Sequence, residues 1–317
     1  MAKKKKSNVL RFILLGIVLV AAFTLYRTFG PNTGKLSKGE YLYIHTGASY
    51  QNVLDSLQAE GYINDMFSFR VLAKLAHYHA HLHPGKYKIA AGMSNYSIIR
   101  MLRSNRQTPV KLVINKLRTK NDLVNIISQN LEADSVSIGK LLTDDTYLDQ
   151  FGLNTNTAMC AIMPNTYQFY WNTNADKAFR KIEKTYAEFW NTDRKQQAKN
   201  KNLTPQQVIV MASILEEESN KDDEKPNIAS VYLNRMNKGL PLQADPTIKF
   251  AIGDFTIRRI TGEYLQVISP YNTYTNKGLP PGPICTPSIV SIEAVLKAPQ
   301  TAFIKTALCS IVLKQVC

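Results

Sequence analysis

Residues 204–218 read TPQQVIVMASILEEE, a stretch that predicts a buried helix ending in three acids. The eight residues 208–215 are nearly all apolar, so the helix is expected to lie in the interior of a folded domain. The start of the helix carries three signals, namely an N-cap, a proline in the first turn and a capping-box glutamine: Thr204, Pro205 and Gln207.

The three acids at the end of this helix are expected to differ in their surroundings. At about 100° per residue, the apolar side chains have a mean direction between Met211 and Leu215. Glu217 lies about 150° and Glu216 about 105° from that direction, whereas Glu218 lies only about 55° away. We therefore expect Glu217 to be solvated and Glu218 to be held against an apolar wall.

Burial would give such a glutamate a chemical use. A low-dielectric wall disfavours the charged form of a carboxyl and can raise its pKa from about 4.3 toward about 6–7. A pKa in that range suits a general acid at neutral pH. The alternative is an ordinary acidic helix end, in which all three carboxylates lie in water.

Two turn-rich segments follow the helix. The first reads GLPLQADPT at 239–247, and the second reads YNTY at 271–274 before GLPPGP at 278–283. Stiff Pro and Gly backbone can hold Asn, Gln and Tyr side chains in fixed positions at a low entropy cost. These segments predict a preformed polar site, and a plain loop scaffold is the alternative.

The charge of the chain is unevenly distributed. The 317 residues include 39 Lys and Arg against 24 Asp and Glu, a net charge of +15. Residues 1–40 hold eight of the bases and one acid, so they contribute +7. A nucleic-acid-binding protein would carry its basic charge on the folded part. The basic leader indicates a membrane instead, and no nucleic-acid partner is expected.

The leader has the pattern of a membrane-spanning helix. Lys3–Lys6 precede an apolar run from Leu10 to Phe29, about 30 Å of helix, which matches a bilayer core. The lysine block favours a cytoplasmic N-terminus and an exported remainder. We expect a cytoplasmic tail at 1–8 and an uncleaved anchor at 9–29. A cleaved signal peptide is the alternative, although no small-x-small site follows the run.

A strand–turn–helix pattern occurs three times between residues 40 and 130. Strand-like stretches at 40–45, 86–90 and 110–114 each precede a Ser or Thr that can cap a short amphipathic helix: Ser49, Ser94 and Thr119. Residues 40–130 are therefore expected to form a small α+β module, of the kind that also builds LysM-like glycan-binding modules. Residues 131–203 are expected to be mostly helical.

The sequence contains no recognisable metal or redox motif. No cysteine lies in a CxxC pair, and three disulfide pairings are open among the four: Cys160, Cys285, Cys309 and Cys317. Four alternating histidines could share one face of a strand and hold a metal: His77, His79, His81 and His83. Because Pro84-Gly85 indicates a turn there, a solvated connector is favoured, and neither a metal nor another cofactor is expected.

Four motifs follow one another in the second half of the chain. They are ASILEEE at 212–218, IASVYLNR at 228–235, LQADPT at 242–247, and YNTY with GLPPGP at 271–283. In this order they resemble the endolytic murein transglycosylases, the MltG or YceG-like family. The resemblance implies an α+β fold, with a single transmembrane helix, the LysM-like module and a mixed α/β catalytic domain at 131–298.

The resemblance also implies an activity. An enzyme of this family would be held at the inner membrane with its catalytic domain in the periplasm, and would cut nascent peptidoglycan strands, ending their elongation. The catalytic glutamate of the family's E-x-E motif falls on Glu218, and Glu216 takes a supporting role. Glu218 would protonate the MurNAc–GlcNAc oxygen and then deprotonate the 6-hydroxyl of MurNAc, closing a 1,6-anhydro ring. Peptidoglycan synthases are implied as partner proteins.

Polar residues of the turn-rich segments are the candidates for binding acetamido and hydroxyl groups of the glycan: Gln243, Asp245, Asn272 and Tyr274. Glu216 is grouped with them as a tentative substrate-binding residue. Loop scaffolding is the alternative for each loop residue. Asp245 is the best second carboxylate if the enzyme is a hydrolase, since ordinary glycosidases use two.

The resemblance ends after Ala298-Pro299. Members of the family usually continue with an aromatic strand and a His-x-Phe segment, whereas residues 299–317 have neither, as expected of a frameshifted or substituted tail. A missing strand would leave a sheet edge unpaired. Two alternatives to the transglycosylase therefore stay open. One is a non-catalytic peptidoglycan-binding membrane protein, and the other is a hydrolytic glycosidase using Glu218 and Asp245.

Overall fold

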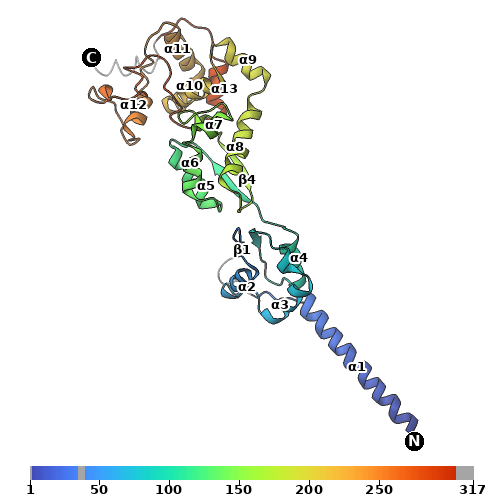
Figure 1. The fold of residues 1–317 in the computed structure, drawn as a ribbon. Coiled ribbons are helices and arrows are strands. Elements are labelled where there is room, and N and C mark those ends of the chain that lie inside the picture. Colours follow the sequence, from blue (N-terminus) through green and yellow to red (C-terminus); the bar gives the residue numbers. More distant parts are fainter. Residues whose placement is uncertain (1, 35–39, 305–317) are drawn as a thin grey trace. The chain divides into compact units, whose positions relative to one another are not determined.

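The computed structural model describes residues 2–34 and 40–304, which divide into two compact units (Figure 1). The first unit extends to residue 110 and includes residues 170–172. The second unit comprises residues 111–169 and the chain from residue 173 onward. The mixed helix and strand content expected from the sequence is confirmed.

The first unit is a small helical layer on a two-stranded antiparallel sheet, preceded by the long apolar helix. In chain order its elements are α1 (Ala2–Phe29), β1 (Tyr41–Ile44), α2 (Tyr50–Ala59), α3 (Met66–Leu75), the 3-10 turn η1 (Tyr78–Ala80), β2 (Gly85–Lys88) and α4 (Asn95–Arg103). In the sheet, Tyr41 pairs with Lys88 and Ile44 with Gly85. The N-caps predicted at Ser49 and Ser94 are confirmed, since each side chain accepts from a backbone N–H of the first turn.

The third strand–turn–helix copy does not join the first two. Thr119 caps its helix as predicted, but β3 (Val110–Ile114) pairs with β4 (Asn165–Phe169) in the second unit. The expected module of three copies is therefore built from two. Strand pairing depends on a partner that lies 50 residues or more along the chain, and a local pattern does not show that partner.

Helix α1 passes both tests of a membrane span, length and composition, over Val9–Phe29. Its last turn packs into the first unit. The Arg27 guanidinium forms an ion pair with Asp65, and the Arg27 carbonyl accepts from the amide of the fully buried Asn95 at 3.0 Å. The Phe29 ring lies 5.1 Å from that of Tyr96. The end of this apolar helix is thus part of the folded unit.

The second unit is mainly helical, and its sheet holds the two strands β3 and β4. Its remaining elements are α5 (Lys120–Asn130), α6 (Ser135–Leu141), α7 (Asp145–Asp149), the 3-10 turn η2 (Ala158–Ala161), α8 (Ala175–Phe189), α9 (Thr192–Asn200), α10 (Pro205–Glu218), α11 (Lys225–Asn237), α12 (Asp245–Ile252), the 3-10 turn η3 (Tyr264–Gln266) and α13 (Ile289–Leu296).

Helix α10 is the centre of the second unit, because it contacts each of four other helices: α9, α11, α12 and α13. Every residue from Val208 to Leu215 is buried, which confirms the interior helix predicted from the sequence. The predicted capping box is also confirmed, because Thr204 and Gln207 bond each other's backbone N–H groups. The two motif segments after α10 are thereby brought to its C-terminal end.

The cysteines and histidines make no assembled site in the described part of the chain. Cys160 and Cys285 are buried free thiols, and the other two cysteines lie outside the described residues. The four alternating histidines lie around the turn η1 rather than on a strand. Within residues 2–34 and 40–304, no three His, Cys, Asp or Glu side chains are grouped to hold a metal ion.

Candidate active site

Three glutamates end α10, and each one faces a different neighbour. Glu216 faces the N-terminus of α13. Its Oε2 accepts from the Ser288 hydroxyl at 2.7 Å and from the Ser291 hydroxyl, and it lies 3.5 Å from the buried Lys225 ammonium. Burial opposes the ionisation of Glu216, but these hydrogen bonds and the lysine outweigh it and hold its pKa below the ordinary value. Glu216 therefore links α10 to α11 and α13.

Glu217 is not solvated, contrary to the prediction from the helical wheel. Its side chain is only 17% exposed and makes ion pairs with Lys116 at 3.1 Å and Arg118 at 3.0 Å. Burial again opposes ionisation, and the two cations lower the pKa of Glu217 in spite of it. The prediction used only the positions of residues around the helix. Both cations come from the segment after β3, about one hundred residues earlier, so they could not enter it.

Glu218 is mostly buried and is the one acid of the three whose pKa rises. Burial is the main cause, the negative charge of Asp245 adds to it, and the pKa is raised to about 7. A hydrogen bond from the Tyr232 hydroxyl and the charge of Lys249 act in the opposite direction. The expected burial and raised pKa of Glu218 are thus found, and the neighbours that act on its carboxyl are Tyr232, Asp245 and Lys249.

One oxygen of the Glu218 carboxyl has no partner. Its Oε2 is buried and makes no hydrogen bond with any described residue, whereas the Tyr232 hydroxyl bonds the same carboxyl group. A buried oxygen without a partner is costly to keep, and such groups concentrate at functional sites. A protonated Glu218 therefore has an oxygen whose hydrogen-bonding capacity no described residue uses, which a general acid requires.

Asp245 lies close enough to Glu218 for its charge to act on that carboxyl, and Tyr274 bonds Asp245. Asp245 is the first residue of α12, and the Tyr274 hydroxyl donates to its carboxylate. The two motif segments are held together by backbone bonds, since the Gln243 N–H donates to the Thr273 carbonyl at 3.0 Å and the Ala244 N–H to the Thr273 hydroxyl at 3.0 Å. The structure thus brings Asp245 near Glu218 and joins Tyr274 to Asp245.

Gln243 is held by Arg235 of α11, the helix that carries the motif IASVYLNR. Its backbone has a positive φ of 57°, which is uncommon for a residue other than glycine. Arg235 fixes this turn, because its guanidinium donates to the Gln243 side-chain oxygen and, at 2.7 Å, to the Pro241 carbonyl. Gln243 remains exposed, so its side-chain amide faces solvent while its oxygen is occupied.

Asn272 lies inside its loop rather than on the surface. It is fully buried, and its amide donates to the carbonyls of Leu265 at 2.9 Å and Val267 at 2.8 Å. Its side-chain oxygen accepts from the Tyr274 N–H at 2.9 Å. All of its hydrogen-bonding groups are therefore occupied within the loop, and its observed role is to shape the turn that presents Tyr274.

Gly282 of the GLPPGP segment is required by close packing. A Cβ at this position would meet the Asn156 carbonyl oxygen and the Tyr271 hydroxyl. Two cavities lie in the same region. One has a volume of about 120 Å³ and a lining that includes Glu217 and Lys249, and a neighbouring one of about 260 Å³ is lined in part by Tyr271 and Pro283. Lys249 therefore faces both Glu218 and a hollow in the surface.

Several contacts of the site were missed from the sequence. Tyr232 is fully buried at the Glu218 carboxyl, and burial is the main cause of its own raised pKa. A tyrosine among the apolar residues of IASVYLNR was the available signal, since a buried hydroxyl needs a partner. Lys249, Lys116 and Arg118 carried no comparable local signal.

Comparisons with known proteins agree with these motifs. An endolytic murein transglycosylase of Bacillus subtilis is 39% identical over 128 residues, which are 40% of this chain and 34% of that protein. An endolytic murein transglycosylase of Streptococcus pneumoniae is 26% identical, with 91% of this chain and 59% of that protein aligned. The chain thus spans between one third and three fifths of the length of these curated relatives.

The fold has a counterpart among solved structures. The crystal structure of a yceG-like protein of Listeria monocytogenes matches with a TM-score of 0.56 and 24% identity, and covers 84% of this chain and 92% of that one. The model of the YceG-like family matches residues 42–304, so it continues past Pro299, where the resemblance was expected to end; residues 305–317 lie outside the described part. Because this match covers most of its length, the chain belongs to the YceG-like family.

Proposed function

We propose that the chain is a membrane-anchored endolytic lytic transglycosylase, which cuts MurNAc–GlcNAc bonds in nascent peptidoglycan strands. The name of its relatives, endolytic murein transglycosylase, supports the class of reaction. The observation that carries the proposal is the state of Glu218. This carboxyl keeps one buried oxygen without a partner, and burial raises its pKa to about 7.

The proposed reaction uses Glu218 twice. As an acid, it protonates the glycosidic oxygen, and the bond between that oxygen and C1 of MurNAc breaks. As a carboxylate, it takes the proton of the MurNAc 6-hydroxyl, whose oxygen then bonds to C1 and closes the 1,6-anhydro ring. No water is added, and Glu218 ends protonated as it began. A pKa near the working pH makes both protonation states accessible.

The neighbours of Glu218 suit these two states. The Tyr232 hydroxyl and the Lys249 ammonium both favour the carboxylate form, which is the form present between the two proton transfers. The internal hydroxyl supplies proximity, which replaces much of what a second carboxylate does in a hydrolase. Gln243 and Asp245, which are both exposed, are proposed to bind the glycan together with Tyr274. Glu216 is proposed to hold the end of α10 in place through Ser288 and Lys225.

The anchor is part of the proposal. Helix α1 has the length and composition of a span, and its end is tied into the first unit by Arg27 and Phe29. A cleaved signal peptide would remove residues on which Asp65 and Asn95 depend, so an uncleaved anchor is favoured over a signal peptide. The Lys3–Lys6 block favours a cytoplasmic N-terminus, with the catalytic unit on the exported, periplasmic face of the inner membrane.

The first unit is proposed to be the LysM-like glycan-binding module, and the second the catalytic domain. An enzyme that combines the two at a membrane would meet strands as they are made. We therefore propose that it terminates strand elongation and works beside peptidoglycan synthases.

The test of the reaction is the chemistry of the new strand ends. We expect digestion of peptidoglycan by the full chain in detergent to give 1,6-anhydro-MurNAc ends, identified by mass spectrometry of the fragments. Run in water enriched in heavy oxygen, the reaction should leave these ends unlabelled, because no water is added.

Two outcomes would contradict this proposal. Reducing ends that carry heavy oxygen would identify a hydrolase, in which Asp245 is the candidate for the second carboxylate because its charge already acts on Glu218. Binding to peptidoglycan without any shortening of the strands would identify a non-catalytic protein.

A further inference from the structure

The helix α3 carries an apolar stripe that the described residues leave largely exposed. Phe67, Val71 and Leu75 are spaced by four residues and are 78%, 46% and 70% exposed. The opposite face of the helix carries the buried Phe69 and Ala73, so the core of the unit does not need this stripe. Three large apolar side chains in one exposed row are typical of an interaction surface.

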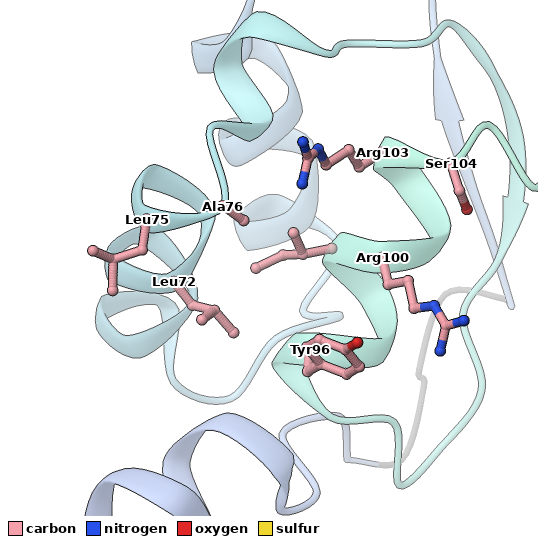
Figure 2. Close-up of a pocket in the computed structure, with 8 residues that line it drawn as sticks. Leu72, Leu75, Ala76, Tyr96, Arg100, Arg103 and Ser104 are labelled. Atoms are coloured by element: carbon pink, nitrogen blue, oxygen red, sulfur yellow. The ribbon is translucent and has the colours of Figure 1, made fainter.

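A hollow continues this stripe between α3 and α4. Its volume is about 540 Å³, and its lining includes Leu72, Leu75 and Tyr96 at the apolar side and Arg100 and Arg103 at the charged side (Figure 2). Figure 2 shows Leu72 and Leu75 on one helix and the tyrosine and both arginines on the other. An apolar floor beside two exposed guanidinium groups suits an anionic amphiphile.

The charge on α3 and α4 is basic, and the acid nearest the stripe, the N-cap Asp65 of α3, is paired with Arg27. Residues 66–110 contain seven Lys and Arg and no Asp or Glu. Four of these bases lie on the two helices: Arg70 and Lys74 on α3, and Arg100 and Arg103 on α4. Such a surface attracts anionic lipid headgroups, because basic side chains near a negatively charged membrane add to its binding.

The same stripe lies against the end of α1. A second cavity, of about 290 Å³, is lined by Phe23, Arg27 and Thr28 of α1 together with Phe67, Val71 and Leu75 of α3. Phe23 is six residues before Phe29, the last residue of the span, and so about 9 Å along the helix. If Val9–Phe29 crosses the hydrocarbon, the stripe lies at the depth of the bilayer interface.

We propose that the α3–α4 face of the first unit is a membrane-docking surface. The stripe Phe67, Val71 and Leu75 inserts into the interfacial region of the bilayer that α1 crosses, and Arg100 and Arg103 bind anionic phospholipid headgroups. This inference rests on the proposal that α1 is an uncleaved anchor. Docking would hold the glycan-binding module at the membrane surface and fix how it presents a strand emerging there.

The test places a reporter at the stripe of the full chain. Phe67→Trp and Leu75→Trp variants are reconstituted in vesicles of phosphatidylcholine and phosphatidylglycerol, with a lipid brominated on its acyl chains as quencher. Lys88→Trp, an exposed position on β2, is the matched control, and the fluorescence of the two native tryptophans is subtracted with the parent chain. We expect the stripe reporters to be quenched about twofold more than the control, as insertion of 5–10 Å requires.

A charge reversal tests the role of the arginines. Arg100→Glu combined with Arg103→Glu, made in the Leu75→Trp background, should reduce quenching toward the level of the Lys88→Trp control. The matched control reverses two exposed lysines of α9, Lys195→Glu with Lys199→Glu, and should leave quenching unchanged. Circular dichroism checks that each variant keeps its helix content.

The outcomes separate docking from anchoring. Co-flotation with the vesicles after an alkaline wash reports whether α1 spans the bilayer. If the chain floats with the vesicles and the stripe tryptophans are quenched, the docking surface is supported. If the chain floats but these tryptophans are not quenched, docking is overturned and the proposal of a membrane anchor is retained. Loss of flotation overturns both. The stripe tryptophans could instead become shielded from solvent as the protein density in the vesicles rises, with no quenching by the brominated chains. That result would show a second copy of the chain on the stripe and would overturn the proposal.

Discussion

Replacing Glu218 by glutamine is expected to abolish strand cleavage, with a loss of about 10³-fold or more in rate. The substitution keeps the shape and the bond with Tyr232, but an amide can neither give the proton to the glycosidic oxygen nor take one from the 6-hydroxyl. The measurement is the release of anhydro ends per enzyme under the conditions that give full activity to the parent chain. Glu188→Gln, on an exposed part of α8, is the matched control and should retain activity.

The same variant should be more stable, which separates lost chemistry from lost fold. The pKa of Glu218 is raised from 4.5 to about 7 in the folded chain, so its contribution to stability is full below pH 4.5 and is lost as the pH rises through 7. Above that range the loss approaches about 3 kcal/mol. Glu218→Gln removes this pH dependence, so its Tm should exceed that of the parent at pH 8 and approach it at pH 4. An inactive variant with a lowered Tm at pH 8 would contradict the burial on which the mechanism depends.

The helix that carries the three acids could be predicted because its signals are local. The capping box and the apolar run lie within fifteen residues of Glu218, and the capping energy and the burial both act there. The neighbours of Glu217 were not predictable in the same way. Lys116 and Arg118 lie about one hundred residues earlier, and only the packed second unit brings them to the end of α10.

The contacts of the loop residues could not be predicted from local sequence either, except for those of Asn272. Asp245 and Tyr274 meet because two turn-rich segments bond each other through Thr273, a contact that no sequence pattern announces. The role of Asn272 in shaping its own loop could be predicted from the residues next to it. Its oxygen accepts from the N–H two residues onward, the Asx turn that asparagine favours in turns, so the sequence alone could have assigned it to the loop.

Replacing Glu216 by alanine is expected to lower stability strongly. This carboxylate accepts from Ser288 and Ser291 on α13 and faces Lys225, whose side chain is only 5% exposed. Removing it leaves the buried ammonium with Asp222 as its remaining partner and takes the acceptor from two hydroxyls, a loss of about 2–3 kcal/mol. At roughly 2–4 °C per kcal/mol, the Tm of the second unit should fall by about 8 °C, measured by calorimetry or circular dichroism.

The pH dependence and the activity of this variant decide between support and catalysis. Because the pKa of Glu216 is held below the ordinary 4.5, its contribution to stability is present above that value and is lost as the pH falls below it. The Tm difference between the parent and Glu216→Ala should therefore shrink in acid. At neutral pH this difference has the opposite sign to that of Glu218→Gln, because Glu216→Ala is less stable than the parent and Glu218→Gln is more stable. Activity should return when the variant is assayed well below its lowered Tm. A variant with the parental Tm and no activity would instead place Glu216 in contact with the glycan.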